Sequence, residues 1–321
     1  MTAVRTRRPT LMAVHAHPDD ESSQTGGTLA RYAAAGCRTV LVTCTDGGLG
    51  DRASADGVPD ADNSTTSQVA AVRSAELAVA TSALGVDEVI ELGHPDSGMP
   101  EDPASIAPEA FSRMDPEPVV TQLTALMREY RPDVVITYPP NGLSFHPDHI
   151  QAHRVTVDAF RQYLATTPRP ASATTGAEPK LYFIAASRTR LQAVRTRGES
   201  LLPAGSWIPP LEIAIDDAAV TTVIDVSEVW SRKIAALAAH GSQADAVALH
   251  ALFSVATPDE QMEEFVLAVP AGACTVVEND LFAGLPPPLR AAAMTSWTTP
   301  RPSVAPGADP WERPGTSSAN P

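Results

Sequence analysis

Residues 15–21 read HAHPDDE, so two histidines and three acidic side chains stand together at the end of an apolar segment. Within this stretch His17 and Asp20 are three residues apart, and a second group, HPDH, occupies residues 146–149. Two histidines and one carboxylate form a catalytic metal site when a fourth position stays open for water. We therefore predict that His17, Asp20 and His149 hold one metal ion.

Asp19 stands between two of the predicted ligands in the sequence and has no coordination role of its own. A carboxylate at that place suits a general base that takes a proton from the water to be activated. Zinc, one ion per chain, is the expected metal, but two histidines and a carboxylate also bind iron(II) in non-haem oxygenases. Because a single His-x-x-Asp segment usually forms only a hydrogen-bonded turn, the metal interpretation requires a fold that brings both groups together.

The segments that must position these groups alternate between strand and helix patterns. Short apolar runs predict strands at 11–16, 39–45, 88–92, 134–138 and 181–187, and helical patterns occur at 26–36, 67–84, 117–130 and 148–164. This alternation predicts an α/β fold with a Rossmann-like, doubly wound and mostly parallel sheet. His-Pro-Asp follows three of the strands, at residues 17–19, 94–96 and 146–148. Since parallel strands end at one edge of the sheet, where ligands bind, the three copies can meet.

After residue 200 the pattern changes to a smaller C-terminal strand and helix extension. Short strands are predicted at 211–216 and 220–226, a helix at 227–240, and a last strand near Val266. The regular alternation of the first half is therefore not expected to continue.

One catalytic domain is predicted for residues 10–297, after a short N-terminal extension at 1–9. Three connections are long enough to act as binding loops, at 46–66, 95–116 and 165–179, and the last of them is expected to be flexible. The tail at 298–321 is rich in proline and poor in apolar residues, which predicts disorder.

The composition is that of a globular protein, with 43% hydrophobic residues and a formal net charge of −15 over 321 residues. An acidic chain repels nucleic-acid phosphates, so we expect no nucleic-acid partner. No apolar run approaches the roughly 18–20 residues of a membrane helix, and the N-terminus lacks a signal-peptide core, which predicts a cytoplasmic protein with no membrane partner. Three cysteines without metal spacing suit apolar packing. A homo-oligomer is compatible with the sequence.

Longer stretches resemble one family. They read AVHAHPDDESSQTGGTLARYAAAGCRTVLVTCTDG from residue 13, GHPDSGM at 93–99, PPNGLSFHPDHIQAH at 139–153 and KIAALAAHGSQ at 233–243. They resemble the LmbE-like (PIG-L) zinc-dependent N-deacetylases, the family of the GlcNAc-PI de-N-acetylase, and are nearest to its mycothiol deacetylase and mycothiol S-conjugate amidase group. The resemblance extends over roughly residues 10–285 and implies an LmbE-like fold.

The resemblance implies roles for five residues. His17, Asp20 and His149 match the family's zinc ligands, and Asp19 matches its general base. His146 matches the histidine that polarises the substrate carbonyl or stabilises the oxyanion. The first four assignments agree with those made from spacing, and the role of His146 comes from the resemblance alone.

The resemblance also implies substrate contacts. Arg73 matches a family arginine that contacts substrate, although an exposed ion pair with Glu76 is the simpler interpretation of its helical spacing. Asp96 matches a residue that binds sugar hydroxyls, although it could equally cap a turn before Gly98.

Two segments depart from the mycothiol enzymes. Residues 46–50 read DGGLG, so Gly48 and Leu49 stand where that group carries acidic side chains, and Ser144 replaces a tyrosine two residues before the HPDH histidine. The metal ligands and the base are retained, whereas substrate recognition at Ser144 and Leu49 is expected to differ.

Three further histidines have weaker interpretations. His15 should point to the opposite face of its strand from His17 and form a structural hydrogen bond. His94 is expected to lie in a turn or at the crevice. His240 belongs to a motif of the family, and we predict only that it packs near the site.

The function that follows is hydrolysis of an N-acetyl or other N-acyl amide in a small amino-sugar or natural-product substrate, as in secondary metabolism. The hypothesis gives zinc the task of acidifying water and Asp19 that of accepting its proton. The alternatives are a mycothiol S-conjugate amidase, a tailoring deacylase, an iron oxygenase, or a noncatalytic protein that binds metal and ligand.

Overall fold

The computed structural model describes residues 7–51, 65–167, 178–270 and 277–285. Its centre is a seven-stranded sheet in the order β3-β2-β1-β4-β5-β7-β6. The strands are β1 Thr10–His15, β2 Arg38–Thr45, β3 Glu88–His94, β4 Val134–Thr137, β5 Lys180–Ala185, β6 Thr222–Asp225 and β7 Met262–Val269. Only β7 runs antiparallel to its two neighbours, β5 and β6, which confirms the mostly parallel sheet.

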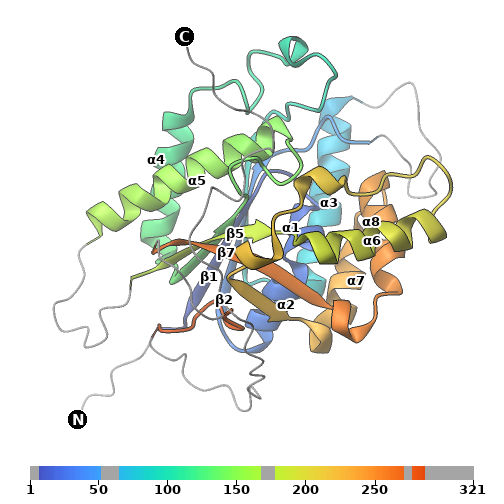
Figure 1. The fold of residues 1–321 in the computed structure, drawn as a ribbon. Coiled ribbons are helices and arrows are strands. Elements are labelled where there is room, and N and C mark those ends of the chain that lie inside the picture. Colours follow the sequence, from blue (N-terminus) through green and yellow to red (C-terminus); the bar gives the residue numbers. More distant parts are fainter. Residues whose placement is uncertain (1–6, 52–64, 168–177, 271–276, 286–321) are drawn as a thin grey trace, which may run out of the picture.

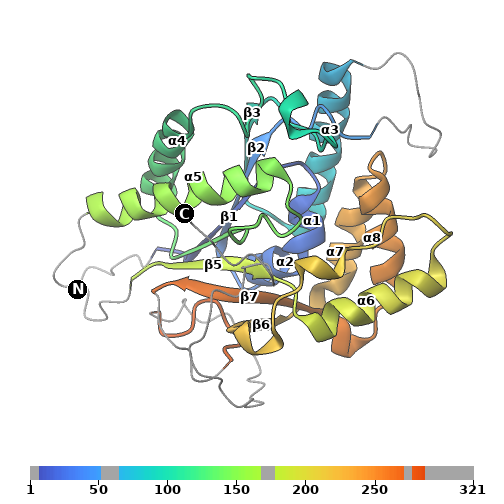
Figure 2. The ribbon, with the colours of Figure 1, turned by 45° about the horizontal axis from the view of Figure 1, so that its top comes forward.

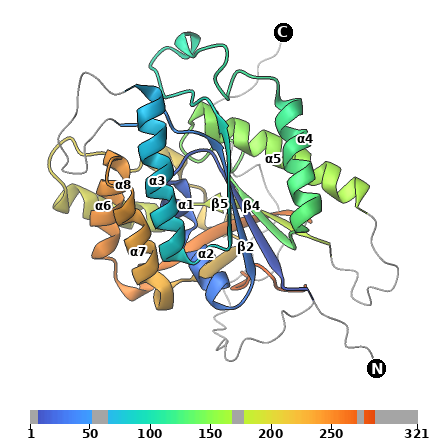
Figure 3. The ribbon, with the colours of Figure 1, turned by 180° about the vertical axis from the view of Figure 1, so that it is seen from behind.

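The helices cover both faces of the sheet (Figures 1 and 3). They are α1 Asp20–Gln24, α2 Gly26–Ala34, α3 Thr66–Leu84, α4 Pro116–Tyr130, α5 Pro147–Thr166, α6 Arg188–Leu201, α7 Trp230–Ala239 and α8 Ala244–Ser254. Seen from behind, α4 and α5 lie on one side and α2, α3 and α7 on the other, with α6 and α8 beyond them. This arrangement explains why β1, β2 and β4 are apolar runs, since central parallel strands are buried on both faces.

The strand order reverses between β1 and β4. The chain leaves β1 for β2 and β3 on one side, then returns through α4 to β4 and continues to β5 on the other (Figure 2). In a doubly wound sheet the ligand crevice opens at such a point, beyond the carboxyl ends of the strands. The predicted metal ligands follow these two strands.

The C-terminal extension differs from the prediction at one segment. Residues 211–216 do not form a strand: Leu211–Ile213 is a 3-10 turn, and Ile215 makes one isolated bridge to Ser187. The segment begins directly after Pro209 and Pro210, and the backbone N–H groups of Ile213 and Ala214 bond locally, to the carbonyl oxygens of Pro210 and Leu211, instead of to a neighbouring strand. The predicted strand at 220–226 and the helix at 227–240 are present as β6 and α7, and Val266 lies in β7.

The sequence patterns did not reveal α1, α6 and α8. Helix α6 carries only two buried residues, Leu191 and Gly198, so it lacks an apolar stripe. Helix α8, ADAVALHALFS, is apolar on nearly all sides and gives no clear period. Helix α1 has only five residues, all of them polar or charged, so it has no apolar pattern to recognise.

Several predicted segments lie partly or wholly outside the described residues: most of the 46–66 and 165–179 connections, Cys274 and the tail at 298–321. Of the N-terminal extension, Arg7 and Arg8 are described and pair with Asp133 and Asp87. Cys37 and Cys44 are buried and free, as predicted. No helix in the described part of the chain is long and apolar enough to cross a membrane.

Candidate metal centre and catalytic site

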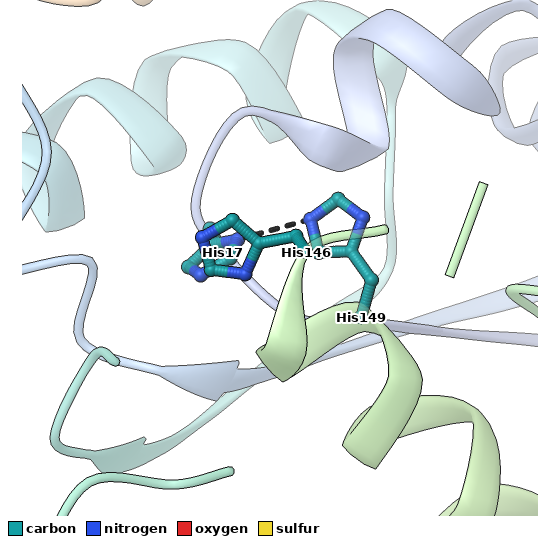
Figure 4. A group of neighbouring side chains, drawn as sticks. All are labelled: His17, His146 and His149. Atoms are coloured by element: carbon teal, nitrogen blue, oxygen red, sulfur yellow. Dashed lines mark hydrogen bonds between the residues drawn. The ribbon is translucent and has the colours of Figure 1, made fainter. Parts of the chain in front are cut away.

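The three histidines of the two motifs meet at the reversal point of the sheet. His17 follows β1, while His146 is the N-cap of α5 and His149 lies in the first turn of that helix. Figure 4 shows their rings gathered between the loop after β1 and the start of α5. As predicted, His17 and His149, which are 132 positions apart in the sequence, lie in one cluster.

The predicted ligand atoms have the spacing that a metal requires. His17 Nδ1 lies 3.2 Å from His149 Nε2 and 3.3 Å from Asp20 Oδ2, and His149 Nε2 lies 3.5 Å from Asp20 Oδ1. Tetrahedral ligands at about 2.0–2.1 Å from zinc are separated by roughly 3.3 Å. All three side chains are buried, so a cation would be held away from bulk water.

Hydrogen bonds from the opposite ring nitrogens turn both histidines toward this centre. His17 Nε2 lies 3.2 Å from Asp148 Oδ2, and His149 Nδ1 lies 3.0 Å from the carbonyl oxygen of Gly142. When these nitrogens carry the protons, Nδ1 of His17 and Nε2 of His149 present lone pairs to the metal. Gly142 has φ of +68°, and a Cβ there would lie 2.8 Å from that of His149, so glycine is required.

His146 also belongs to the cluster. Its ring joins two overlapping groups of ligand atoms that each lie within 4.8 Å, one with His17 and His149, the other with His17, Asp96 and Asp148. However, His146 Nδ1 accepts the backbone N–H of Asp148 at 3.2 Å. The ring proton then sits on Nε2, which becomes a hydrogen-bond donor and cannot also offer a lone pair. Burial and the neighbouring His17 and His149 lower the pKa of His146, which favours this neutral form.

The charges of the ligand set depend on one another. Burial opposes the charged form of His17, but the carboxylates of Asp96 and Asp148 outweigh it and raise the pKa of His17 well above its usual value. Burial likewise opposes the charge of Asp20, and His149 and His17 nevertheless hold the pKa of Asp20 well below its usual value. A buried excess of carboxylates that draws positive charge toward itself is a suitable environment for a cation.

Asp19 occupies a strained position beside the ligands. Its φ is 126° and its ψ is −28°, a conformation that costs a residue other than glycine about 1–3 kcal/mol. Its carboxylate accepts a hydrogen bond of 2.7 Å from Arg73. Burial raises the pKa of Asp19 to about 8, although the Arg73 guanidinium opposes the rise. A carboxylate with its pKa near neutrality can both accept and return a proton.

Arg73 does not form the exposed pair with Glu76 that its spacing suggested. The side chain is buried, and besides Asp19 it donates to the carbonyl oxygens of Pro18 at 2.6 Å and Gly47 at 2.9 Å. Glu76 instead accepts hydrogen bonds from Ser242. Arg73 therefore fixes the catalytic loop in addition to lining the cavity.

Asp96 and Ser144 also reach the centre. Asp96 Oδ1 lies 3.5 Å from His17 Nε2, and the same oxygen accepts the backbone N–H of Gly98 at 2.8 Å, so Asp96 caps this turn, while its contact with sugar hydroxyls stays a prediction. Ser144 Oγ lies 3.1 Å from His149 Nδ1. The serine thus contacts a predicted ligand directly and also lines the cavity.

Sequence reasoning missed Asp148, Tyr138 and Glu21. Asp148 is the aspartate of the third His-Pro-Asp, and the repeat itself was the signal that it could be needed. The Tyr138 ring stacks on His149 with centroids 4.2 Å apart, and its hydroxyl accepts the backbone N–H of Ala16 at 2.9 Å. Nothing in the pattern of residues 134–138 indicated that contact.

The remaining histidines lie around the site. His15 Nε2 lies 2.9 Å from Thr25 Oγ1, the structural hydrogen bond that was predicted. His94 stacks on Phe111 with centroids 5.5 Å apart. His240 Nε2 lies 2.8 Å from Glu21 Oε1, and both residues are fully buried. Burial opposes charge on Glu21, but His240 lowers the pKa of that carboxyl below its usual value.

The cluster opens into a cavity of about 600 Å³ that also reaches the C-terminal helices. One part of its wall is polar and is formed by Asp51, Arg73, Asp96, Gln243 and Asp245. The other part is apolar and is formed by Leu191, Val194, Trp207, Ile213, Leu249 and Phe253. The cavity is therefore amphiphilic, and the proposed metal ligands and Asp19 also line it.

Comparison with known proteins identifies the family. Residues 12–160 match the family GlcNAc-PI de-N-acetylase. A 1D-myo-inositol 2-acetamido-2-deoxy-α-D-glucopyranoside deacetylase from Acidothermus cellulolyticus is 40% identical over 86% of this chain and 94% of its own length. The enzyme of the same description from Mycobacteroides abscessus is 40% identical over 87% of this chain and 99% of its own length.

Solved structures share the fold at low sequence identity. The 4-carboxy-2-hydroxymuconate hydratase GalB from Pseudomonas putida has a TM-score of 0.53 at 18% identity, covering 82% of this chain and 98% of its own. The N,N'-diacetylchitobiose deacetylase from Pyrococcus horikoshii has a TM-score of 0.50 at 17% identity, covering 80% and 83%. A hydratase and a deacetylase on one fold show that the fold does not determine the reaction. The sequence relationship does: this chain belongs to the GlcNAc-PI de-N-acetylase (PIG-L, LmbE-like) family, and its activity is metal-dependent N-deacetylation.

Proposed function

We propose that the protein removes the N-acetyl group of a small amino-sugar glycoside, with the 2-acetamido-2-deoxyglucoside of myo-inositol as its preferred substrate. Relatives that are 40% identical over 94% and 99% of their own lengths are named for that substrate. The observation that carries the proposal is the set of ligand atoms 3.2 to 3.5 Å apart with the Asp19 carboxylate beside it.

The donor set of two imidazole nitrogens and a carboxylate fits zinc, which we propose as the cofactor held by His17, Asp20 and His149. A bound zinc ion supplies a Lewis acid that acidifies water and polarises a carbonyl. All three side chains line the cavity, so a substrate in the cavity can approach the ion that they would hold.

The other side chains have separate roles in proton transfer, oxyanion stabilisation and substrate binding. Asp19, held by Arg73, accepts the proton of the attacking water and then passes it to the leaving amine. His146 donates its Nε2 proton in a hydrogen bond to the carbonyl oxygen as negative charge develops there. Arg73 and Asp96, in the polar part of the cavity, are the proposed partners of the sugar hydroxyls, and Ser144 is proposed to contact the substrate beside His149.

Amine release from the glucosaminyl-inositol substrate and from other N-acetylglucosaminides tests the proposal. Zinc-loaded wild type should release amine from at least the inositol glycoside, and Asp19→Asn should retain zinc without comparable turnover. Turnover of none of these glycosides by protein with one bound zinc would contradict the proposed substrate class. Near-normal turnover by Asp19→Asn would instead contradict the base assignment.

A second substrate class is favoured by exposed apolar side chains in the wall of the cavity. Leu49, Met99 and Trp207 line the cavity and remain 49%, 62% and 44% exposed. Exposed large apolar side chains at a binding site favour an apolar ligand group. This supports an amide whose acyl group is larger than acetyl, as in an S-conjugate amidase or a natural-product deacylase.

A series of N-acyl glucosamines from acetyl to hexanoyl and phenylacetyl separates the two classes. A KM that falls as the acyl group grows, and rises again in Trp207→Ala, would favour the larger amides. A preference for acetyl throughout the series would exclude this second class.

A further inference from the structure

The backbone of Asp19 is held by a chain of buried hydrogen bonds that begins in the C-terminal part of the protein. His240 Nε2 lies 2.8 Å from Glu21 Oε1, and the other oxygen of that carboxylate, Oε2, accepts the backbone N–H of Asp19 at 2.9 Å. His240 and Glu21 are both 0% exposed. Neither side chain lines the cavity, so neither can contact substrate or metal directly.

These hydrogen bonds end at Asp19, the residue with strained backbone in the loop after β1. Asp19 has φ of 126°, a value that side-chain-bearing residues adopt only where their surroundings impose it. Its carbonyl oxygen accepts N–H groups from Ser22 and Ser23, and its carboxylate is held by Arg73. The backbone N–H of Asp19 has only the Glu21 carboxylate as a partner among the described contacts.

His240 is itself fixed by the fold. It is the C-cap of α7, and its carbonyl oxygen accepts the backbone N–H of Gln243 at 3.1 Å. The next turn is joined to α3, because Ser242 donates to Glu76 from both its backbone N–H and its hydroxyl. Helix α7 also packs against α1 and α3. The position of His240 relative to Glu21 is therefore determined by tertiary packing.

We propose that His240, through Glu21, is a positioning residue for Asp19: the pair holds the backbone of Asp19 in its strained conformation and so aims the catalytic carboxylate. This inference rests on the proposed function, in which Asp19 is the base. It gives the C-terminal part of the chain, which lies outside the family match at residues 12–160, an indirect part in the chemistry, through the position of Asp19.

The test compares two substitutions at one position. His240→Leu keeps apolar volume and removes the donor, whereas His240→Gln keeps an N–H donor at the end of a side chain of similar reach. The leucine variant should lower kcat by about 10- to 100-fold, with KM and zinc content little changed, as is usual for the loss of an indirect positioning contact. The glutamine variant should recover a large part of that loss.

Ser242→Ala is the matched control. It removes the hydroxyl that donates to Glu76 and accepts from Gln243 Nε2 in the same turn, without touching Glu21. Its kcat should stay within about twofold of wild type. An equal loss in Ser242→Ala and His240→Leu would show that the turn matters only for general stability and would overturn the inference.

A double-mutant cycle shows whether the effect passes through Asp19. In the Asp19→Asn background, His240→Leu should cause no further loss of residual kcat, because effects that act through one group are not additive. Losses that multiply in the double variant would contradict the proposed route.

Hydrogen exchange of the backbone N–H of Asp19 provides a readout that does not need turnover. Glu21→Gln has one acceptor oxygen where the carboxylate has two, so protection of the Asp19 amide should fall in Glu21→Gln and His240→Leu but not in Ser242→Ala. Unchanged protection would overturn the inference. Absence of turnover in the wild type would count against the proposed function and would leave this structural result to decide the positioning role.

Discussion

The two parts of the cavity are built in different ways. The catalytic part rests on short motifs, His17 to Asp20 and His146 to His149, in which nearly every polar atom is fixed by a hydrogen bond to a neighbour. The apolar part is formed by α6, α8 and the segment between α6 and β6, and Trp207 there is 44% exposed. The difference indicates that the reaction is fixed by a rigid hydrogen-bonded network, whereas the choice of substrate depends on a wall that can vary without disturbing it.

Removal of a metal ligand should break the catalytic part most severely. His149→Ala deletes a nitrogen that lies 3.2 Å from His17 Nδ1, so two of the three proposed ligands remain. We expect loss of stoichiometric zinc and amine release reduced to background, measured by elemental analysis and by turnover. Full zinc content with normal turnover would place the metal elsewhere.

Loss of the base should be the next largest effect. Asp19→Asn keeps the shape of the side chain and removes its capacity to accept a proton, so kcat should fall by about 10²- to 10⁴-fold. Zinc content should remain at one ion per chain, which distinguishes this variant from His149→Ala. A loss of zinc in Asp19→Asn would instead identify Asp19 as a ligand.

Asp148 should have an intermediate effect. Asp148→Asn weakens the contact of 3.2 Å that turns His17 toward the metal, and we expect about a 10- to 100-fold loss in zinc affinity or activity. Competition with a chelator measures the affinity. An affinity equal to that of wild type, together with normal kcat, would show that the orientation of His17 does not depend on Asp148.

A buried ion pair in the wall of the cavity tests stability without touching the ligands. Lys233 donates to Glu263 at 2.5 Å, and Glu263 also accepts the backbone N–H groups of Gly27 and Thr28. Lys233→Met leaves a buried carboxylate without its cation, which should lower the free energy of unfolding by about 3–5 kcal/mol. Denaturant unfolding measures the change, and a loss below about 1 kcal/mol would contradict the importance of the pair.

Trp207→Ala should have the smallest effect on turnover, and it tests most sharply whether the catalytic and apolar parts of the cavity are independent. Because Trp207 belongs to the apolar part and contacts no ligand, zinc content and turnover of an N-acetyl substrate should stay within about twofold of wild type. A large loss of kcat on the acetyl substrate would show that the two parts of the cavity are not independent.

The sequence predicted the catalytic part better than the apolar part, for physical reasons. His17, Asp20 and His149 fall after β1 and β4, whose apolar runs are easily recognised, and parallel topology then brings their ends together. The apolar wall comes from α6 and α8, which lack a clear period, and from residues 211–216, where local backbone hydrogen bonds form a 3-10 turn in place of the predicted strand.

Contacts between polar residues far apart in the sequence also could not be predicted from local sequence patterns. Nothing in the sequence joins Glu21 to His240 or Arg73 to Asp19, since these pairs are 219 and 54 residues apart. The helical spacing of Arg73 even favoured the wrong partner, Glu76. Burial decides such cases, because a buried guanidinium must find acceptors wherever the fold provides them.

Diffraction from crystals of the zinc-loaded protein, with anomalous data at the zinc edge, tests the central claim most directly. The account predicts one ion bound by His17 Nδ1, His149 Nε2 and Asp20, with nitrogen distances of about 2.0–2.1 Å and with His146 outside the coordination sphere. An ion on the opposite side of the His17 ring, bound through Nε2 together with Asp96 and Asp148, would contradict it.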